Sequence, residues 1–113
     1  MKLIWTEVAV STIEDIRDHV TIEAGEQAAR RLVERILASV ERLSQFPRSG
    51  RTIPDFSDPT SREILTGSYR VIYHLDSVDS PSEITIYGVL HGSRLLENTP
   101  AWPLLDENGT DDE

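Results

Sequence analysis

Three arginines in the second half of the chain lie in, or just after, short apolar runs that are typical of strands. Arg62 and Arg70 lie within such runs, and Arg94 follows a run that ends at His91. The 113-residue chain carries a formal charge of −9, so arginines that recur at strands indicate a dedicated cationic site rather than general basicity. A guanidinium suits bidentate, planar recognition of an anion. We therefore take Arg62, Arg70 and Arg94 as the candidate functional residues.

Each arginine also has a purely structural interpretation. Arg70 is placed to pair with Glu63 on the neighbouring strand, and Arg62 is placed to be an edge-strand charge that discourages association between sheets. Arg51 follows a predicted helix, and this position favours a role as a positive charge at the C-terminus of that helix. Arg94 stands at the end of a strand, where functional residues are common.

The three histidines, His19, His74 and His91, are far apart in the sequence, with no carboxylate at ligand spacing. We predict neither a metal site nor a cofactor. Ser93 stands near His91, but a nucleophilic triad requires a third member that the sequence does not identify. His91 is a weaker functional candidate than the arginines, as an acid–base group on the strand that leads to Arg94.

The bulk composition favours one compact domain in the cytoplasm. With 113 residues, 38% of them hydrophobic, the chain is long enough for a single core. It has no cysteine, so neither disulfides nor a thiolate zinc site are expected. The first residues lack the apolar run of a signal peptide, and no window approaches the ~18 apolar residues of a membrane span. The negative charge argues against general nucleic-acid binding, although the basic residues are ten arginines and one lysine.

Hydrophobic periodicity predicts the elements that position the arginines. Apolar residues at spacings of three and four predict two helices, and alternation predicts strands. The expected order is a strand at 3–5, a helix at 7–19, a longer helix ending near 46, a loop at 47–61, and strands at 62–65, 69–75 and 84–91. The link between the helices is short, so they form an antiparallel hairpin.

These elements predict an α+β domain of the order β-α-α-β-β-β. The last three strands form an antiparallel meander, with one face against the helical hairpin and the other partly open to solvent. We expect the domain to span residues 1–98 and to be followed by an acidic, flexible tail at 99–113. Trp102 is unusual for such a tail, and it either folds back onto the core or anchors a partner.

Five fragments of the sequence follow one another in a fairly specific order. They are Trp5-Thr6, Leu43 to Arg51 with its Phe-Pro-x-x-Gly-Arg junction, Arg62-Glu63-Ile64, Tyr69-Arg70-Val71-Ile72-Tyr73, and Val89 to Arg94 with its His-Gly-x-Arg end. This ordered set strongly resembles the ParE/RelE superfamily of bacterial toxins, over roughly residues 1–96. The resemblance implies the toxin of a type II toxin–antitoxin pair, which arrests growth and is held inactive in a hetero-oligomer with its cognate antitoxin.

The resemblance implies a different target for each branch of the superfamily. RelE-like toxins are ribosome-dependent endoribonucleases that cut mRNA, whereas ParE-like toxins inhibit DNA gyrase. Cleavage of RNA through its 2′-hydroxyl requires a base, an acid and cations. Arg62, Arg70 and Arg94 could supply the cations, but no tyrosine or histidine follows Arg94, and the one lysine is Lys2.

The longer helical hairpin and the Phe-Pro-x-x-Gly-Arg junction resemble the ParE branch more than the RelE branch. We therefore favour a toxin that inhibits DNA gyrase and is not itself an enzyme. One alternative is a RelE-like endoribonuclease acting on the ribosome and mRNA. The other is an inactive module that only binds the antitoxin.

Overall fold

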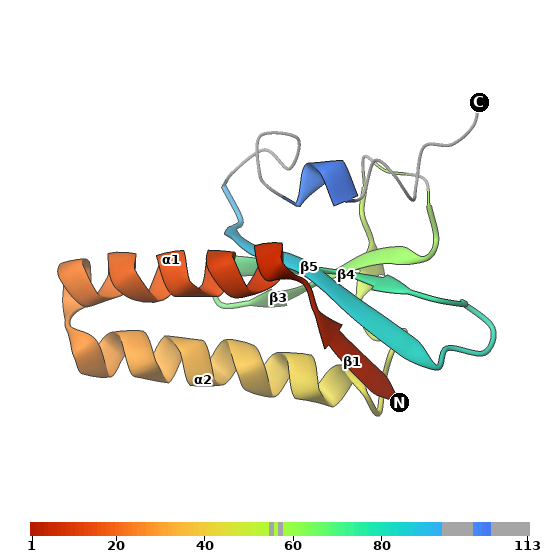
Figure 1. Cartoon of the computed structure of the whole chain (residues 1–113), viewed down its shortest axis with the longest axis horizontal. Coiled ribbons are helices and arrows are strands. Elements are labelled where there is room, and N and C mark those ends of the chain that lie inside the picture. The colour runs from red at the N-terminus through yellow and green to blue at the C-terminus, as the bar shows by residue number, and fades with distance from the viewer. Residues whose placement is uncertain (55, 57, 94–100, 105–113) are drawn as a thin grey trace.

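Among the described residues, a five-stranded sheet and two long helices form the main body of the fold (Figure 1). The computed structural model describes residues 1–54, 56, 58–93 and 101–104. The elements are β1 (Lys2–Trp5), α1 (Glu7–Ala24), α2 (Glu26–Leu43), β2 (Arg51–Thr52), β3 (Ser61–Thr66), β4 (Tyr69–Leu75) and β5 (Glu83–His91). The predicted α+β class, with its helical hairpin and antiparallel meander, is confirmed.

The strands at the two edges of the sheet make it larger than the predicted meander. The order is β1-β5-β4-β3-β2, in which β1 runs parallel to β5 and the other neighbours are antiparallel. The short strand β2 lies within the stretch that we expected to be a loop, and it pairs Arg51 with Glu63 and Thr52 with Arg62. Two residues carry no alternation, so this strand exists only because β3 provides its partner.

The start of α1 is bound to the sheet. Thr6 Oγ1 accepts a hydrogen bond from the Ala9 N–H at 3.0 Å and donates one to the carbonyl of Ile86 in β5 at 2.8 Å. The first bond caps the helix, and the second fixes its direction relative to β5. α1 continues past the predicted end to Ala24, and Gly25 at φ +97° alone connects it to α2. This one-residue link produces the antiparallel hairpin.

The first hydrophobic core lies between the hairpin and one face of the sheet. α2 buries Ile36, Val40 and Leu43, whose spacing of three and four residues places them on one side of the helix. The helix ends at Leu43, slightly before the predicted end near Phe46. The buried side chains of the sheet that complete this core are Val71, Tyr73, Leu75, Ile84, Ile86 and Val89.

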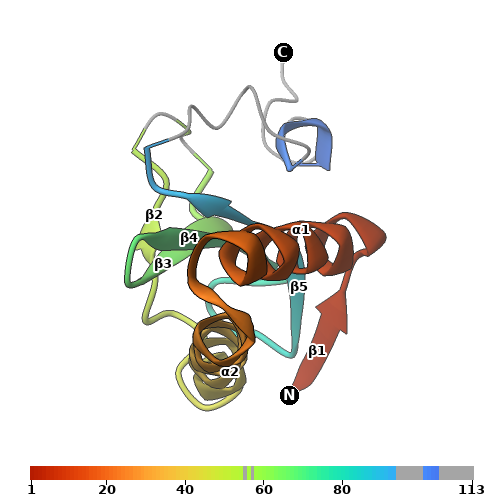
Figure 2. The same cartoon turned by 90° about the vertical axis from the view of Figure 1, so that its left-hand side faces the viewer.

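The other face of the sheet has a second, smaller core. Its buried members are Ile53, Phe56, Ile72, Tyr87, Leu90 and Ala101. The Trp102 ring meets that of Phe56 edge-on, with 5.5 Å between ring centroids, so Trp102 folds back onto this core. Figure 2 looks along the hairpin and shows the helical turn at 102–104 on the opposite side of the view from α2. The face expected to be partly open is therefore covered at this place.

The expected boundary between domain and tail, at residues 98 and 99, lies outside the described residues. Within the expected tail, only 101–104 are described, and Ala101 is buried. In the part of the chain that the structure describes, no helix combines the length and the apolar character needed to cross a membrane.

Candidate functional site

The candidate site is organised around a buried carboxylate, that of Glu63. The Glu63 side chain is 0% exposed, on the face of β3 that points away from the helices. Its Oε2 accepts a hydrogen bond from Arg51 Nε at 2.7 Å. Its Oε1 accepts one from Arg70 Nε at 2.7 Å and lies 2.6 Å from Arg70 Nη2. One buried carboxylate thus holds two guanidinium groups.

The sheet register explains why these three side chains meet. Arg51 of β2 stands directly opposite Glu63. Arg70 of β4 stands opposite Leu65, so it is the diagonal neighbour of Glu63 on the same face. The Arg70 side chain is only 14% exposed, whereas that of Arg51 is 61% exposed. Arg70 therefore depends on Glu63 for charge compensation far more than Arg51 does.

Arg62 has a different environment, because adjacent residues of a strand point to opposite faces. Its Nε donates to the carbonyl of Pro59 at 3.0 Å. Its Nη1 donates to the carbonyls of Arg48 and Gly50 at 3.2 and 3.1 Å. Arg62 therefore ties the segment before β2 to the segment before β3, and the structure does not bring it together with Arg70 in one anion site.

The Phe-Pro-x-x-Gly-Arg junction is built around the phenol of Tyr73. Tyr73 Oη donates to the carbonyl of Pro47 at 2.9 Å and accepts from the Gly50 N–H at 3.0 Å. Burial raises the pKa of Tyr73. A Cβ at residue 50 would lie 2.5 Å from Tyr73 Oη and 2.6 Å from the carbonyl oxygen of Glu63. Only glycine fits this position. The close approach of the chain at Gly50 places the following residue, Arg51, beside Glu63.

His91, the weaker candidate, lies at the exposed end of β5, and Arg94 lies outside the described residues. His91 stands opposite Tyr69, and the two rings meet edge-on with centroids 5.4 Å apart. Its Nδ1 lies 2.8 Å from Ser93 Oγ. Because Tyr69 and Arg70 alternate, His91 shares the face of Tyr69 and not that of Arg70. The structure therefore separates the imidazole of His91 from the two guanidinium groups that Glu63 binds.

A cavity that sequence reasoning missed lies beside His91. It has a volume of about 380 Å³ and is lined by Thr12, Asp15, Ile16, His19, Tyr69, Val89, Leu90 and His91. It brings His19 of α1 close to His91 of β5, which no sequence spacing indicates. Within the part of the chain that the structure describes, no group of three or more histidines, cysteines and carboxylates is suited to hold a metal ion.

A match to a protein-family model assigns the chain to a family. The model describes the "ParE toxin of type II toxin-antitoxin system, parDE", and it matches residues 3–96. The chain belongs to this family. It is therefore a type II toxin of the ParE/RelE superfamily. Among curated proteins, no sequence matches.

Two solved structures share the fold of this ParE-family toxin. One is the chromosomal ParDE toxin–antitoxin system from P. aeruginosa, 24% identical with a TM-score of 0.66, covering 80% of this chain and 95% of that chain. The other is the YoeB/ParE toxin from Agrobacterium tumefaciens, 17% identical with a TM-score of 0.56, covering 80% of this chain and 98% of that chain. At these identities the likeness concerns the fold alone.

His74, on the same sheet face as Arg70, is expected to make the stability of this ParE-family toxin depend on pH. Its ring stacks on that of Tyr87 with centroids 5.8 Å apart. Burial lowers the pKa of His74 from 6.5, and nearby Asp58 and Asp76 oppose this in part. As the pH falls through 6.5, the unfolded chain takes up a proton that the folded chain does not. The free energy of unfolding should therefore decrease.

Urea denaturation at a series of pH values between about 7.5 and 5.5 measures this dependence. His74→Gln should show a shallower decline than the unaltered chain, because the substituted side chain does not titrate. Equal slopes for the two proteins would exclude His74 as the cause.

Proposed function

We propose that this toxin is neutralised by a cognate antitoxin and arrests growth in the cytoplasm by inhibiting DNA gyrase, without cutting RNA itself. The observation that carries this proposal is the compensation of the arginines within the protein. Glu63 binds Arg51 and Arg70, and the described donors of Arg62 bind backbone carbonyls.

RNA cleavage needs guanidiniums that are free to bind a phosphorane, together with a base and an acid. If Arg70 turned to a phosphate, the fully buried carboxylate of Glu63 would lose its more buried partner, at a cost of several kcal/mol. Glu63 itself cannot accept a proton from a 2′-hydroxyl without giving up these ion pairs. The geometry around Glu63 thus favours a structural ion-pair cluster, and binding of the target falls to other surfaces.

One observation favours the RelE-like alternative. The cavity beside His91 also contains His19 and Tyr69, so two imidazoles and a phenol line one opening. Those groups are of the kinds that serve as acid and base. Arg94, which follows β5 in the sequence, remains our candidate for contact with the target in either case.

The deciding experiment is a pulse-label of DNA and protein synthesis within minutes of inducing the toxin in bacteria without its antitoxin. We expect DNA synthesis to stop first and purified toxin to block supercoiling by gyrase. If protein synthesis stops first and mRNA is cut on the ribosome, the endoribonuclease alternative holds. If bacteria that express the folded chain grow at an unchanged rate, the inactive module that only binds the antitoxin remains as the explanation.

Two variants sharpen this experiment. Arg94→Ala is expected to remove growth arrest while the chain keeps its thermal unfolding midpoint and its antitoxin binding. His91→Ala is expected to leave gyrase inhibition unchanged, whereas an endoribonuclease that uses the His91 cavity would lose its activity. Co-expression of the antitoxin should restore growth in every case.

A further inference from the structure

The cavity beside His91 contains hydrogen-bond acceptors that the described part of the protein leaves without a partner. One is the carboxylate of Asp15, which α1 places in the lining of this cavity of about 380 Å³. Asp15 forms no ion pair with any described residue. An ionised carboxylate accepts hydrogen bonds through both oxygens and donates none. The Asp15 carboxylate is therefore available to a ligand that brings N–H donors.

The carbonyl of Val89 is a second such acceptor. β1 pairs with β5 only as far as Ile86, so no described strand borders this edge of β5 at Val89. The Val89 N–H donates to Thr12 Oγ1 at 3.0 Å, and it therefore points to α1. Because the N–H and C=O of one strand residue point to the same side, the Val89 carbonyl also faces α1. Thr12 Oγ1 donates its own proton to the Ala9 carbonyl at 2.8 Å, which leaves the Val89 carbonyl free to accept.

The remaining walls of the cavity are apolar and aromatic. Ile16 of α1 supplies an apolar wall, and the rings of Tyr69 and His91 meet edge-on with centroids 5.4 Å apart. The face of an aromatic ring carries partial negative charge and attracts a cation, by about 0.5–2 kcal/mol. The volume lies within the range of about 300–1,000 Å³ that is typical of small-molecule sites. An apolar body with a positive group matches these walls.

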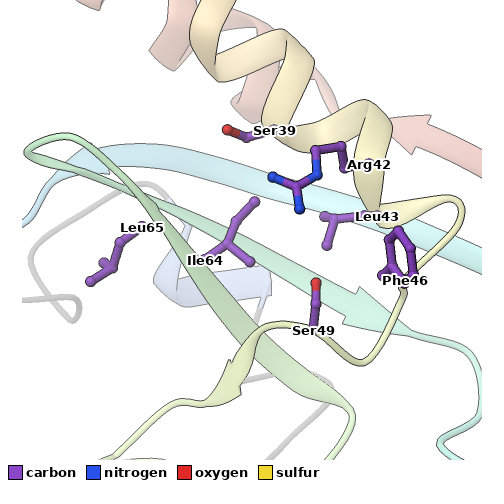
Figure 3. A pocket seen from close by; sticks show the side chains of 7 residues that line it. All are labelled: Ser39, Arg42, Leu43, Phe46, Ser49, Ile64 and Leu65. Carbon is purple, nitrogen blue, oxygen red and sulfur yellow. The ribbon is translucent and has the colours of Figure 1, made fainter.

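A groove of the same volume elsewhere on the protein has the opposite charge. It lies between the end of α2 and β3, and the Arg42 guanidinium lies over it (Figure 3). Arg42 forms no ion pair with any described residue, so this groove repels a cation. Among the described residues that line the cavity beside His91, none is a lysine or an arginine. In a chain of formal charge −9, this cavity suits a cation and the groove does not.

We propose that the cavity beside His91 binds an organic cation, in which an amidinium, guanidinium or ammonium group is carried on an apolar body. The N–H groups of the cation donate to the Asp15 carboxylate and the Val89 carbonyl. Its apolar body packs on Ile16 and against the ring of Tyr69. An organic anion would face the Asp15 carboxylate, and a neutral ligand of the same shape would gain no ion pair. The inference does not rest on the proposed inhibition of gyrase.

The first test uses benzamidine, a flat organic cation, and two probes of similar shape: benzamide, which is neutral, and benzoate, which is an anion. NMR spectra of the amides of the full chain follow each titration at about pH 7.5, where an ordinary imidazole is mostly uncharged. Benzamidine should shift the signals of Val89, Leu90 and His91 and bind at least about tenfold more tightly than benzamide. Benzoate should not shift these signals. Equal affinities for benzamidine and either control, or shifts confined to the groove at Arg42, would overturn the proposal.

The second test changes the carboxylate. Asp15→Asn should weaken the binding of benzamidine about tenfold and leave that of benzamide unchanged, because only the cation pairs with Asp15. The matched control is Asp18→Asn, which removes the same charge from α1 at a side chain that is 72% exposed and does not line the cavity. It should bind benzamidine within about twofold of the unaltered chain. Equal losses in two variants that keep their thermal unfolding midpoints would show attraction to the overall charge, and would overturn the site.

The last measurement distinguishes two sources of such a cation, a free small molecule and an arginine side chain of another protein. The probes are butylguanidine and a tripeptide of arginine between two glycines with both ends blocked, each in competition with benzamidine. Displacement by both would assign the site to a protein side chain. Displacement by butylguanidine alone would assign it to a free small molecule, because the opening then excludes a peptide backbone. Displacement by neither would overturn the proposal.

Discussion

Glu63→Gln is expected to lower the free energy of unfolding by about 3 kcal/mol or more, and this is the largest effect that we expect from a single side chain. The substitution removes the charge that compensates Arg70, whose side chain is only 14% exposed. An uncompensated buried cation is costly, whereas Arg51, at 61% exposed, can turn into solvent. Small domains have a total stability of about 5–15 kcal/mol, so the loss is large. Urea denaturation followed by circular dichroism measures it.

A matched control is Glu83→Gln. Glu83 pairs with Lys2 at 3.9 Å, and the two side chains are 40% and 71% exposed. Surface pairs of this kind contribute about 1 kcal/mol or less, so this variant should unfold close to the unaltered chain. Equal losses from Glu63→Gln and Glu83→Gln would contradict the description of Glu63 as a buried ion-pair centre.

The ion pair between Glu63 and Arg70 also predicts that the destabilising effects of substitutions at these two residues do not add. The double variant Glu63→Leu, Arg70→Met replaces the buried charges by apolar groups of similar volume, which is often tolerated. It should be more stable than Glu63→Leu alone, because no buried guanidinium is left without a partner. A double variant less stable than both single variants would show that the apolar surroundings of Glu63 cannot accept such a replacement.

This energetic role changes how a loss of toxicity should be interpreted. Arg70→Ala would leave the Glu63 carboxylate buried with a single, largely exposed partner, and Arg62→Ala would release the loops that meet at Gly50. Both variants can abolish toxicity through unfolding alone. Growth assays on them therefore need a parallel measurement of stability. Arg94→Ala tests our candidate for contact with the target, and it needs the same parallel measurement of stability.

The order of the elements could be predicted because each long element has a clear period. Ile36, Val40 and Leu43 lie on one side of α2, and the alternation of β4 is visible in the sequence. β2 has only two residues and no period, so it was missed. Without β2, Arg51 was interpreted as a charge at the helix C-terminus, whereas the structure pairs it with Glu63.

Within the candidate site, the predicted order of strands indicated the contact between Arg70 and Glu63 but not the proximity of His19 and His91. The pairing of Arg70 with Glu63 was among the structural interpretations, because neighbouring strands of a meander bring such residues together. That His19 and His91 line one cavity depends on how α1 crosses β5, which no local pattern encodes. The role of Arg62 in binding carbonyls also depends on loop paths, which lack a repeat.

Gly50→Ala is expected to destabilise the protein by about 3 kcal/mol. The added methyl would stand 2.5 Å from Tyr73 Oη and 2.6 Å from the Glu63 carbonyl oxygen. Tyr73 is fully buried and the Glu63 oxygen belongs to the backbone of β3, so neither can move away easily. The hydrogen bond from the Gly50 N–H to Tyr73 would also be distorted. Thermal and urea unfolding of the purified variant measure the loss.

A double-variant cycle with Tyr73→Phe identifies the cause of that loss. Tyr73→Phe alone should cost about 2 kcal/mol, because the Gly50 N–H and the Pro47 carbonyl lose their shared partner in a buried place. In the double variant the Oη is absent, so the combined loss should fall short of the sum by roughly 1 kcal/mol. Gly25→Ala provides the contrast: its Cβ meets nothing within 4 Å, and only its φ of +97° is unfavourable. The loss of stability from Gly25→Ala should therefore add to the loss from Tyr73→Phe. If the losses from Gly50→Ala and Tyr73→Phe also add, the clash with the phenol is not the reason that this junction requires glycine.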